Sequence, residues 1–224
     1  MTLVVFDLDD TLYLEADFVR SGFAAVEAAL RIAGLAATAW LLHEAGRRGD
    51  VLTEALRRHH REPTTEELNT AIAVYRYHTP RISLAPDGDA AIAAFASDPS
   101  MELALLTDGD AVTQRNKIGA LGLADRIGRF MITDELGPDR TYWKPNPEAF
   151  RLLQGNVRPS GRCVYIADNP RKDFEAPMRL GWHTVRLRRR GGLWANEPDA
   201  HVSPEATLRD LAALPECVRS LVLS

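Results

Sequence analysis

The sequence has few cysteines and no long hydrophobic run. Only Cys163 and Cys217 occur among its 224 residues, without a CxxC pair. They do not make the disulfide framework of a small secreted domain, so we expect reduced thiols. No stretch reaches about 18 apolar residues free of charge, and the apolar run at residues 3–6 is too short for the core of a signal peptide. We therefore expect a cytoplasmic protein with no membrane partner.

The sequence also lacks a large excess of charge of either sign. Lysine and arginine number 27 against 31 aspartate and glutamate, which gives a formal net charge of −4. This balance provides no global electrostatic reason to bind nucleic acid. An anionic substrate would then need a local positive site, supplied by a metal ion, a lysine or backbone N–H groups. The hydrophobic fraction of 46% is enough for one good core and leaves room for a small second module.

A dense run of positive charge is present at residues 186–190, where the sequence reads RLRRR. It leaves the last of the strands predicted below. A solvated connection is the default interpretation of such a run. The alternative is contact with an anionic partner or with another subunit.

Short apolar runs rich in β-branched and aromatic residues predict buried strands. These runs lie at residues 3–6, 103–107, 130–133, 164–167 and 184–187. Helical patterns separate several of them, at about residues 111–121, 147–153 and 172–180. Strands that alternate with helices predict an α/β fold, here a Rossmann-like, doubly wound parallel sheet.

Residues 15–84 follow a different pattern. They contain alanine-rich amphipathic stretches and no convincing strand, and Thr64 or Thr65 before Glu66 and Glu67 is typical of a helix start. We interpret this interval as an all-helical insertion between the first two strands, with the segment APDG at residues 85–88 marking the return to the core. The predicted domains are an α/β core of residues 1–14 and 85–224, and a helical module of residues 15–84.

Acidic side chains follow two of the predicted strands at the point where each strand ends. The first strand runs into Asp7 and Asp9, which alternation places on one side of an extended chain, and the fourth runs into Asp168. The carboxyl ends of parallel strands form the ligand-binding edge of an open α/β sheet. If the acids converge there, about 4 kcal/mol of repulsion per pair at about 4 Å must be relieved by protonation or by a cation. An all-oxygen site of this kind suits Mg²⁺.

Two further segments can hold phosphate. The second strand ends in Thr107, Asp108 and Gly109, where a hydroxyl group and the following N–H groups can bind phosphate oxygens. Lys144 precedes a helix whose start is fixed by Pro147, and its charge can neutralise both phosphate and the carboxylates. Each signal is weak alone. Their order at the ends of successive strands makes the set strong.

In these segments the sequence resembles the haloacid-dehalogenase-like hydrolases. The matching segments are FDLDDTL, LLTDG, WKPNP and IADNPRKDF. The resemblance implies the phosphatase branch with a helical cap between the first and second motifs, which would exclude water and select the leaving group. The dehalogenases proper lack the second acid of the first motif, so Asp9 argues against dehalogenation. Asp108 stands where Asn is frequent, and Ala167 where Gly often precedes the metal-binding Asp.

The resemblance implies roles in catalysis and phosphate binding. Asp7 would be the nucleophile that forms an aspartyl-phosphate, and Asp9 the acid and base. Thr107, the N–H of Asp108, and Lys144 would bind the transferring phosphoryl group. Because Asp9 needs a proton at neutral pH, we expect burial beside other acids to raise its pKa.

The resemblance also implies the metal ligands. Mg²⁺ would be held by Asp7, the backbone carbonyl of Asp9, and Asp168. Asp173 would contribute through a metal-bound water or by orienting Lys144. The sequence therefore predicts a Mg²⁺-dependent phosphatase of small phosphorylated metabolites, with sugar phosphates and nucleoside monophosphates both open. The alternatives are a phosphomutase and a non-catalytic binding or regulatory subunit, although a pure binding role does not require an acid at Asp9.

Overall fold

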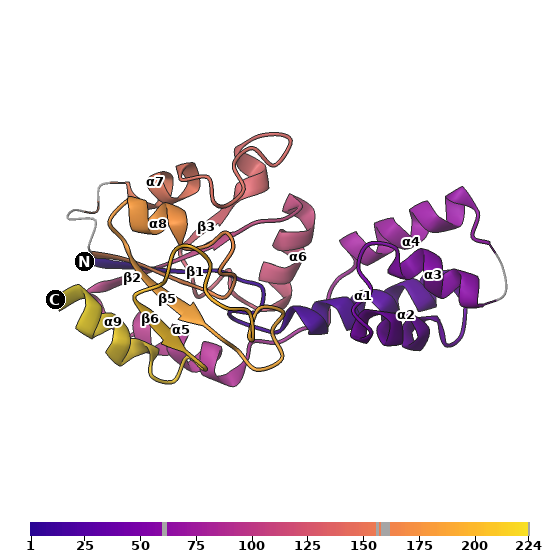
Figure 1. The fold of residues 1–224 in the computed structure, drawn as a ribbon, viewed down its shortest axis with the longest axis horizontal. Coiled ribbons are helices and arrows are strands. Elements are labelled where there is room, and N and C mark those ends of the chain that lie inside the picture. The colour runs from indigo at the N-terminus through magenta and orange to yellow at the C-terminus, as the bar shows by residue number, and fades with distance from the viewer. Residues whose placement is uncertain (60–61, 156, 158–161, 224) are drawn as a thin grey trace. The chain divides into compact units, whose positions relative to one another are not determined.

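The computed structural model describes residues 1–59, 62–155, 157 and 162–223. The chain forms two compact units, Met1–Glu15 with Ser83–Ser224, and Ala16–Ile82. Figure 1 labels their helices and strands. Within the described residues, none of the helices is both long and apolar enough to cross a membrane.

The first unit is built on a six-stranded parallel sheet. Its strands are β1 (Thr2–Phe6), β2 (Met101–Thr107), β3 (Arg129–Ile132), β4 (Cys163–Ala167), β5 (His183–Leu187) and β6 (Ala206–Leu208). Their order across the sheet is β3-β2-β1-β4-β5-β6, with every neighbouring pair parallel. The chain builds outward from β1 to β3, then returns to β4 and builds the other way. The predicted α/β, Rossmann-like sheet is confirmed. The direction in which successive strands are added reverses between β1 and β4.

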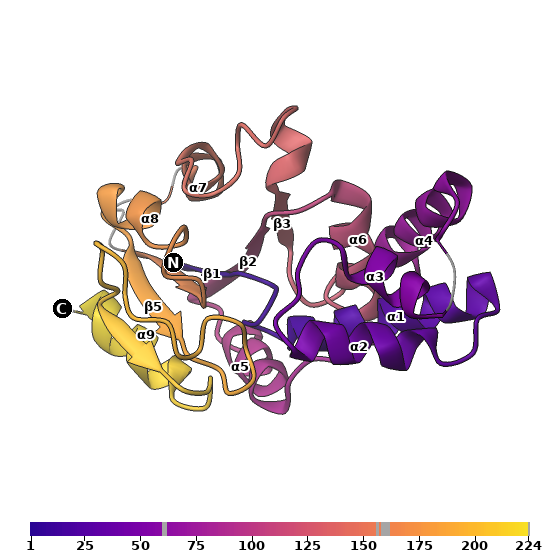
Figure 2. The ribbon, with the colours of Figure 1, turned by 45° about the vertical axis from the view of Figure 1, so that its right-hand side comes forward.

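Helices cover both faces of this sheet, which explains why β1 is apolar from Leu3 to Phe6. All five of its residues are buried. Leu3 and Val5 pack in a cluster with side chains of α7 (Glu148–Gln154) and α8 (Glu175–Arg179). On the other face Phe6 packs against Phe95 of α5 (Pro86–Ala96), and α9 (Leu214–Leu223) packs against α5. Figure 2 shows these two helix pairs on opposite sides of the sheet.

Two shorter elements follow β2 and β3 in the first unit. Helix α6 (Ala111–Ala120) comes directly after β2, and the 3₁₀ turn η1 (Thr133–Leu136) comes directly after β3. The N-cap residue of α6 is Asp110, whose carboxylate accepts a hydrogen bond from the backbone N–H of Thr113 at 2.9 Å. This cap fixes where α6 begins, just beyond the end of β2.

The second unit is helical in its described residues, as the sequence predicts for the insertion. Helix α1 (Glu15–Leu30) leads into it, followed by α2 (Leu35–Glu44), α3 (Val51–Arg58) and α4 (Thr65–Tyr77). Its core contains Phe23, Val26 and Ala55. The predicted start of the last helix is confirmed, because Thr64 and Glu67 form a capping box in which each side chain bonds the other's backbone N–H.

The basic run at residues 186–190 is not a solvated connection, so that prediction is wrong. Arg186 is fully buried, forms an ion pair with Asp199 and donates to backbone carbonyls. Arg189 forms an ion pair with Asp87 at the start of α5. These guanidinium groups tie the segment after β5 to the rest of the core, because each planar group can donate several hydrogen bonds at once.

Candidate active site

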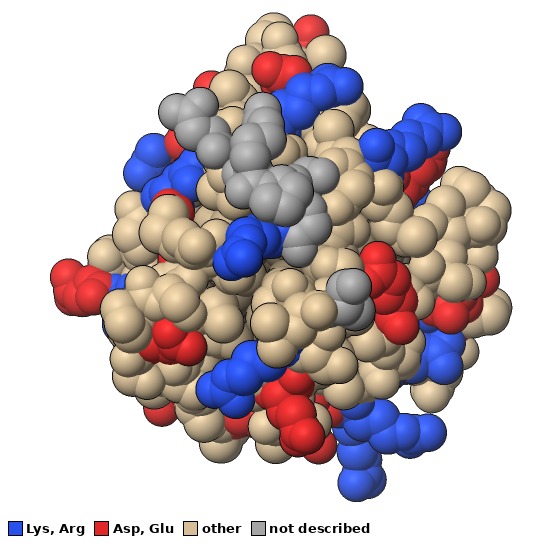
Figure 3. Space-filling view, turned by 90° about the vertical axis from the view of Figure 1, so that its left-hand side faces the viewer, with Lys and Arg blue, Asp and Glu red and all other residues tan. Residues whose placement is uncertain are grey.

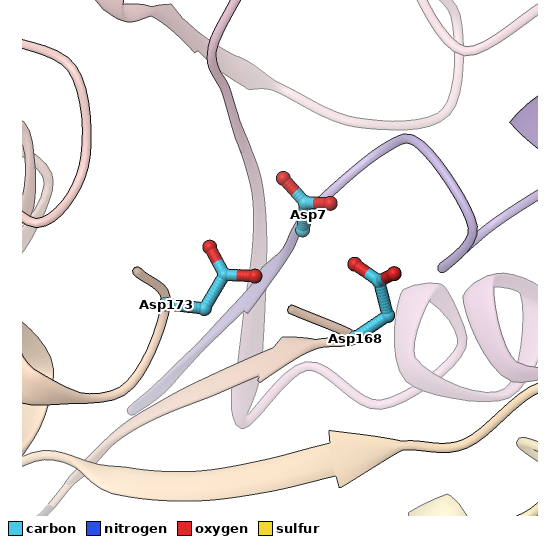
Figure 4. A group of neighbouring side chains, drawn as sticks. All are labelled: Asp7, Asp168 and Asp173. Carbon is cyan, nitrogen blue, oxygen red and sulfur yellow. The ribbon is translucent and has the colours of Figure 1, made fainter. Parts of the chain in front are cut away.

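The acids expected at the edge of the sheet meet in the first unit. Asp7 directly follows β1 and Asp168 directly follows β4. These two strands are the neighbours between which the order of strand addition reverses. Asp173 comes from the loop that follows. Carboxylate oxygens of the three residues lie within 4.8 Å of one another, and all three residues are buried (Figure 4). Ligands bind at this kind of switch point in open α/β sheets.

Lys144 lies against this group of acids. Its Nζ is 2.6 Å from Asp7 Oδ1 and 2.8 Å from Asp173 Oδ1, and it donates to the hydroxyl of Tyr165 at 2.8 Å. The side chain is fully buried. Although burial lowers its pKa, the carboxylates of Asp173 and Asp7 raise the pKa of Lys144 well above its usual value. The lysine is therefore charged and is held by two carboxylates at once.

Asp168 has no such partner. Among the described residues, no basic side chain forms an ion pair with it. Burial, together with the charges of Asp7 and Asp173, raises the pKa of Asp168 well above its usual value. Burial also raises the pKa of Asp7, to about 7, against the lowering effect of Lys144. A buried acid that faces other acids without a cation of its own is the environment that a metal ion would relieve.

The charges around the site test whether a divalent cation fits. Five carboxylates belong to this region, and three lysines form ion pairs with them. The carboxylates are those of Asp7, Asp9, Asp108, Asp168 and Asp173, and the lysines are Lys117, Lys144 and Lys172. Full ionisation of this set leaves two negative charges unbalanced. The neighbouring carboxylates of Asp10 and Glu15, which interact with Asp168 and Asp9, add further negative charge. The oxygen donors and this charge both suit Mg²⁺.

Asp9 lies in a separate, donor-rich environment. Its carboxylate accepts hydrogen bonds from the hydroxyl of Tyr13, from Lys117 Nζ at 2.8 and 3.0 Å, and from Gln114 Nε2 at 3.1 Å. Burial raises the pKa of Asp9, but Lys117, Tyr13 and Gln114 together lower it below its usual value. The expectation of a raised pKa is therefore wrong. The sequence analysis did not predict that a lysine of α6 contacts this carboxylate.

Thr107 and Asp108 lie at the end of β2, as predicted, but the carboxylate of Asp108 is already engaged. Thr107 Oγ1 accepts from Gln114 Nε2 at 2.6 Å. The Asp108 carboxylate accepts from the hydroxyl of Thr133 at 2.8 Å, the backbone N–H of Lys144 at 3.1 Å and Lys172 Nζ at 2.7 Å. Burial raises the pKa of Asp108, but Lys144 and Lys172 lower it further than burial raises it.

Sequence reasoning missed several residues that contact the predicted ones. They are Tyr13, Gln114, Lys117, Thr133, Tyr165 and Lys172. Two signals were available. Gln114 and Lys117 are three residues apart on a predicted helix that follows Thr107, so they share a face. Lys172 directly precedes Asp173, inside a segment already assigned to the site.

Comparison with protein families and curated proteins gives three findings. The model of a family described as haloacid dehalogenase-like hydrolase matches residues 1–181. A phosphoserine phosphatase of Thermus thermophilus is 34% identical over 133 residues, which span 58% of this chain and about half (49%) of that protein. A glyceraldehyde 3-phosphate phosphatase of Methanopyrus kandleri is 31% identical over 206 residues, which span 83% of each chain.

Solved structures share the fold at low sequence identity. The HAD-hydrolase YfnB of Bacillus subtilis, bound to magnesium, superposes with a TM-score of 0.70 at 15% identity, over 97% of this chain and 98% of that one. An L-2-haloacid dehalogenase of Xanthobacter autotrophicus superposes with a TM-score of 0.63 at 20% identity, over 98% and 99% of the two chains. At these identities the superpositions establish the fold alone.

Proposed function

The chain belongs to the haloacid dehalogenase-like hydrolases, and on that premise we propose that it is a Mg²⁺-dependent phosphatase of small phosphorylated metabolites. One observation carries the proposal. The buried carboxylates of Asp7, Asp168 and Asp173 converge where β1 and β4 end, with Lys144 held against Asp7. The two curated relatives described above are both phosphatases, which supports phosphate monoesters as the substrate class.

The proposed metal ligands are Asp7, Asp168 and the backbone carbonyl of Asp9. Asp173 would orient Lys144, with which it forms an ion pair. A bound Mg²⁺ ion would stabilise the negative charge of the transferring phosphoryl group and balance the excess charge of the carboxylates. The magnesium-bound relative supports the choice of metal.

In the first step, the carboxylate of Asp7 would attack phosphorus and displace the alcohol, leaving an aspartyl-phosphate. Lys144 would neutralise charge at the attacking carboxylate and at the phosphoryl oxygens. The hydroxyl of Thr107 and the backbone N–H of Asp108 would hold those oxygens in place. Phosphoryl transfer depends mainly on this kind of positioning and charge stabilisation.

Asp9 would move the protons of both steps. It would give a proton to the departing alcohol, and it would then take one from the water that hydrolyses the aspartyl-phosphate. The donors around Asp9 favour its ionised form. That form is ready for the second of these two roles.

In this proposal residues 1–14 and 85–224 are the catalytic core, and residues 15–84 are the cap that would exclude water and select the leaving group. A small substrate also agrees with the surface charge. On the face of the molecule seen in Figure 3, lysine and arginine side chains are interspersed with aspartate and glutamate. The described basic side chains on that face therefore form no concentrated patch of the kind that binds nucleic acid.

Hydrolysis of 4-nitrophenyl phosphate tests the proposal. We expect Mg²⁺-dependent release of inorganic phosphate over many turnovers, lost in EDTA and reduced by more than roughly 1,000-fold in Asp7→Asn. The exposed Asp125 supplies a matched control, because Asp125→Asn makes the same chemical change away from the site. Activity that survives EDTA or Asp7→Asn would rule the proposal out. With a sugar phosphate in place of 4-nitrophenyl phosphate, isomer formation without phosphate release would identify a phosphomutase. No activity on either substrate would favour the non-catalytic alternative.

A further inference from the structure

Three hydrogen-bond donors surround the carboxylate of Asp9. Lys117 Nζ lies 2.8 Å from one Asp9 oxygen and 3.0 Å from the other. Gln114 Nε2 donates to Oδ2 at 3.1 Å, and the hydroxyl of Tyr13 donates to Oδ1. The three donors are almost completely buried, at 4%, 1% and 0% exposure for Lys117, Gln114 and Tyr13. Both oxygens are thus fixed in place.

Helix α6 provides two of these donors from one face. Gln114 and Lys117 are three residues apart, a spacing that places both on the same side of the helix. The Gln114 amide also donates to Thr107 Oγ1 at 2.6 Å. One side-chain amide therefore connects the proposed acid and base with a proposed phosphate-binding hydroxyl. This arrangement fixes Asp9 relative to the place where the phosphoryl group would lie.

We propose that Gln114 and Lys117 are positioning residues that hold Asp9 for the second step, hydrolysis of the aspartyl-phosphate. The inference rests on the proposed function. In that step the oxygen of water forms a bond to phosphorus, and the bond between phosphorus and the Asp7 carboxylate breaks. One proton of the water passes to the Asp9 carboxylate, and Asp7 and inorganic phosphate are released.

The hydrogen-bonding pattern selects this step over the first. An ionised carboxylate only accepts hydrogen bonds, whereas a protonated one must also donate. Lysine ammonium and the amide NH₂ of glutamine are donors, so they match the form of Asp9 that takes a proton from water. Loss of either donor releases the carboxylate from the orientation that water activation requires, and small misplacements of this kind slow chemistry strongly.

Lys117→Met with 4-nitrophenyl phosphate tests the inference, because this leaving group needs little help from an acid. We expect kcat to fall about 10- to 100-fold while kcat/KM stays within about threefold, since kcat/KM reports only the steps up to departure of nitrophenolate. The aspartyl-phosphate should accumulate, giving a burst of nitrophenolate and a hydroxylamine-labile phosphoryl group on the acid-quenched protein. A merely structural defect would not produce that species.

Gln114→Leu and Arg115→Met complete the design. Gln114→Leu leaves the Lys117–Asp9 ion pair in place and should shift the same quantities in the same direction by a smaller factor. Arg115→Met removes a positive charge from the same helix, but its partner is Glu135 and its side chain is 67% exposed. We expect wild-type kinetics from that control.

Two results would overturn the inference. One is a parallel loss of kcat and kcat/KM in Lys117→Met and Gln114→Leu without accumulated aspartyl-phosphate, and the other is unchanged kinetics in both. Failure of the proposed function is distinguishable, because the wild-type protein would then show no Mg²⁺-dependent phosphate release. If the wild-type protein is active and the variants accumulate no aspartyl-phosphate, the inference alone fails.

Discussion

Asp108 connects three segments of the core through a single carboxylate. One oxygen accepts from the hydroxyl of Thr133 and from the backbone N–H of Lys144, and the other accepts from Lys172 Nζ. The backbone N–H comes from the segment that carries the lysine of the proposed phosphate site. The side chain of Asp108 thus helps to position that segment, in addition to any role of its backbone N–H in binding phosphate.

Substitution of Asp108 separates its charge from its hydrogen bonds. Asp108→Asn keeps an acceptor for Thr133 and Lys144 and loses the ion pair with the part-exposed Lys172, so we expect unfolding free energy to fall by about 1 kcal/mol. Asp108→Ala also leaves the buried backbone N–H of Lys144 without its acceptor and leaves the Thr133 hydroxyl only the longer, 3.4 Å hydrogen bond to the Thr107 carbonyl, so it should cost about 3 kcal/mol or more. Urea unfolding of the two variants measures the difference. Equal losses would show that the buried hydrogen bonds contribute nothing beyond the ion pair.

At the residue scale, the sequence predicts the groups that follow strands and misses those that reach the site from helices. The convergence of Asp7 and Asp168 could be predicted because the carboxyl ends of parallel strands share one edge. The contact of Lys117 with Asp9 depends on how α6 packs, which periodicity alone does not specify. For the same reason the direction of the Asp9 pKa shift was predicted with the wrong sign.

Among the elements, α5 is tied to two distant segments by one residue of its first turn. The Asp87 carboxylate accepts from Arg189 Nη1 at 2.8 Å and Nη2 at 3.0 Å, and from the backbone N–H of Leu211 at 2.8 Å. Burial raises the pKa of Asp87, but the hydrogen bonds from Arg189 and Leu211 lower it below its usual value. The ionised carboxylate therefore stabilises the fold where α5 begins.

The stability contribution of Asp87 should depend on pH in a defined direction. Its pKa is lower in the folded chain than in the unfolded one, so the contribution is present above the unfolded pKa and is lost as pH falls through the folded pKa. We expect Asp87→Asn to lower the unfolding free energy by about 1–3 kcal/mol at pH 7. The difference from wild type should shrink below about pH 4. Urea unfolding at several pH values measures it, and a difference that stays constant down to pH 3 would contradict this account.

At the element scale, most strands and the helical insertion could be predicted, whereas α5 could not. Pro86 and Gly88 suggested a turn, yet Pro86 occupies the first turn of a helix, where its missing N–H costs nothing. Gly88 is glycine for a packing reason and not because of a turn, since a Cβ there would lie 3.1 Å from the backbone carbonyl oxygen of Leu12. Strand β6 was missed because it has only three residues, one exposed and two part-exposed, and they carry too little hydrophobic pattern.

For the whole molecule, the proposed metal site would couple stability to metal binding. Asp168 is buried next to other acids, and the described basic side chains form no ion pair with it. Without a cation, the repulsion among these acids opposes folding. With a cation bound only to the folded chain, the same oxygens stabilise it by mass action.

Asp168→Asn should therefore have opposite effects with and without metal. In EDTA we expect the variant to be more stable than wild type by about 1–4 kcal/mol, because one buried negative charge is removed. With Mg²⁺ at about 100 times its dissociation constant, wild type should gain about 2.7 kcal/mol. The variant should gain much less.

Thermal or urea unfolding measures both effects, with Asp125→Asn as the matched control that should respond to Mg²⁺ like wild type. An Asp168→Asn protein that is less stable than wild type in EDTA would contradict the charge argument. An unchanged response of that variant to Mg²⁺ would contradict the assignment of Asp168 as a ligand.

At the scale of the whole molecule, the order of the strands in the sheet could not be predicted from the sequence. Alternating strands and helices predict a parallel sheet, but many orders satisfy that pattern. The observed order makes β1 and β4 neighbours, and this pairing brings Asp7 and Asp168 together. The motifs indicated that the acids converge, whereas the physical reason for it lies in tertiary structure.

The central claim is that phosphorus passes through a covalent bond to Asp7, and the stereochemical course of hydrolysis tests it most directly. Each in-line displacement inverts the configuration at phosphorus. The substrate is a phosphate ester made chiral at phosphorus with oxygen isotopes, hydrolysed in isotopically labelled water. Attack by Asp7 followed by attack of water predicts overall retention of configuration. Inversion would show a single direct attack by water and would contradict the account.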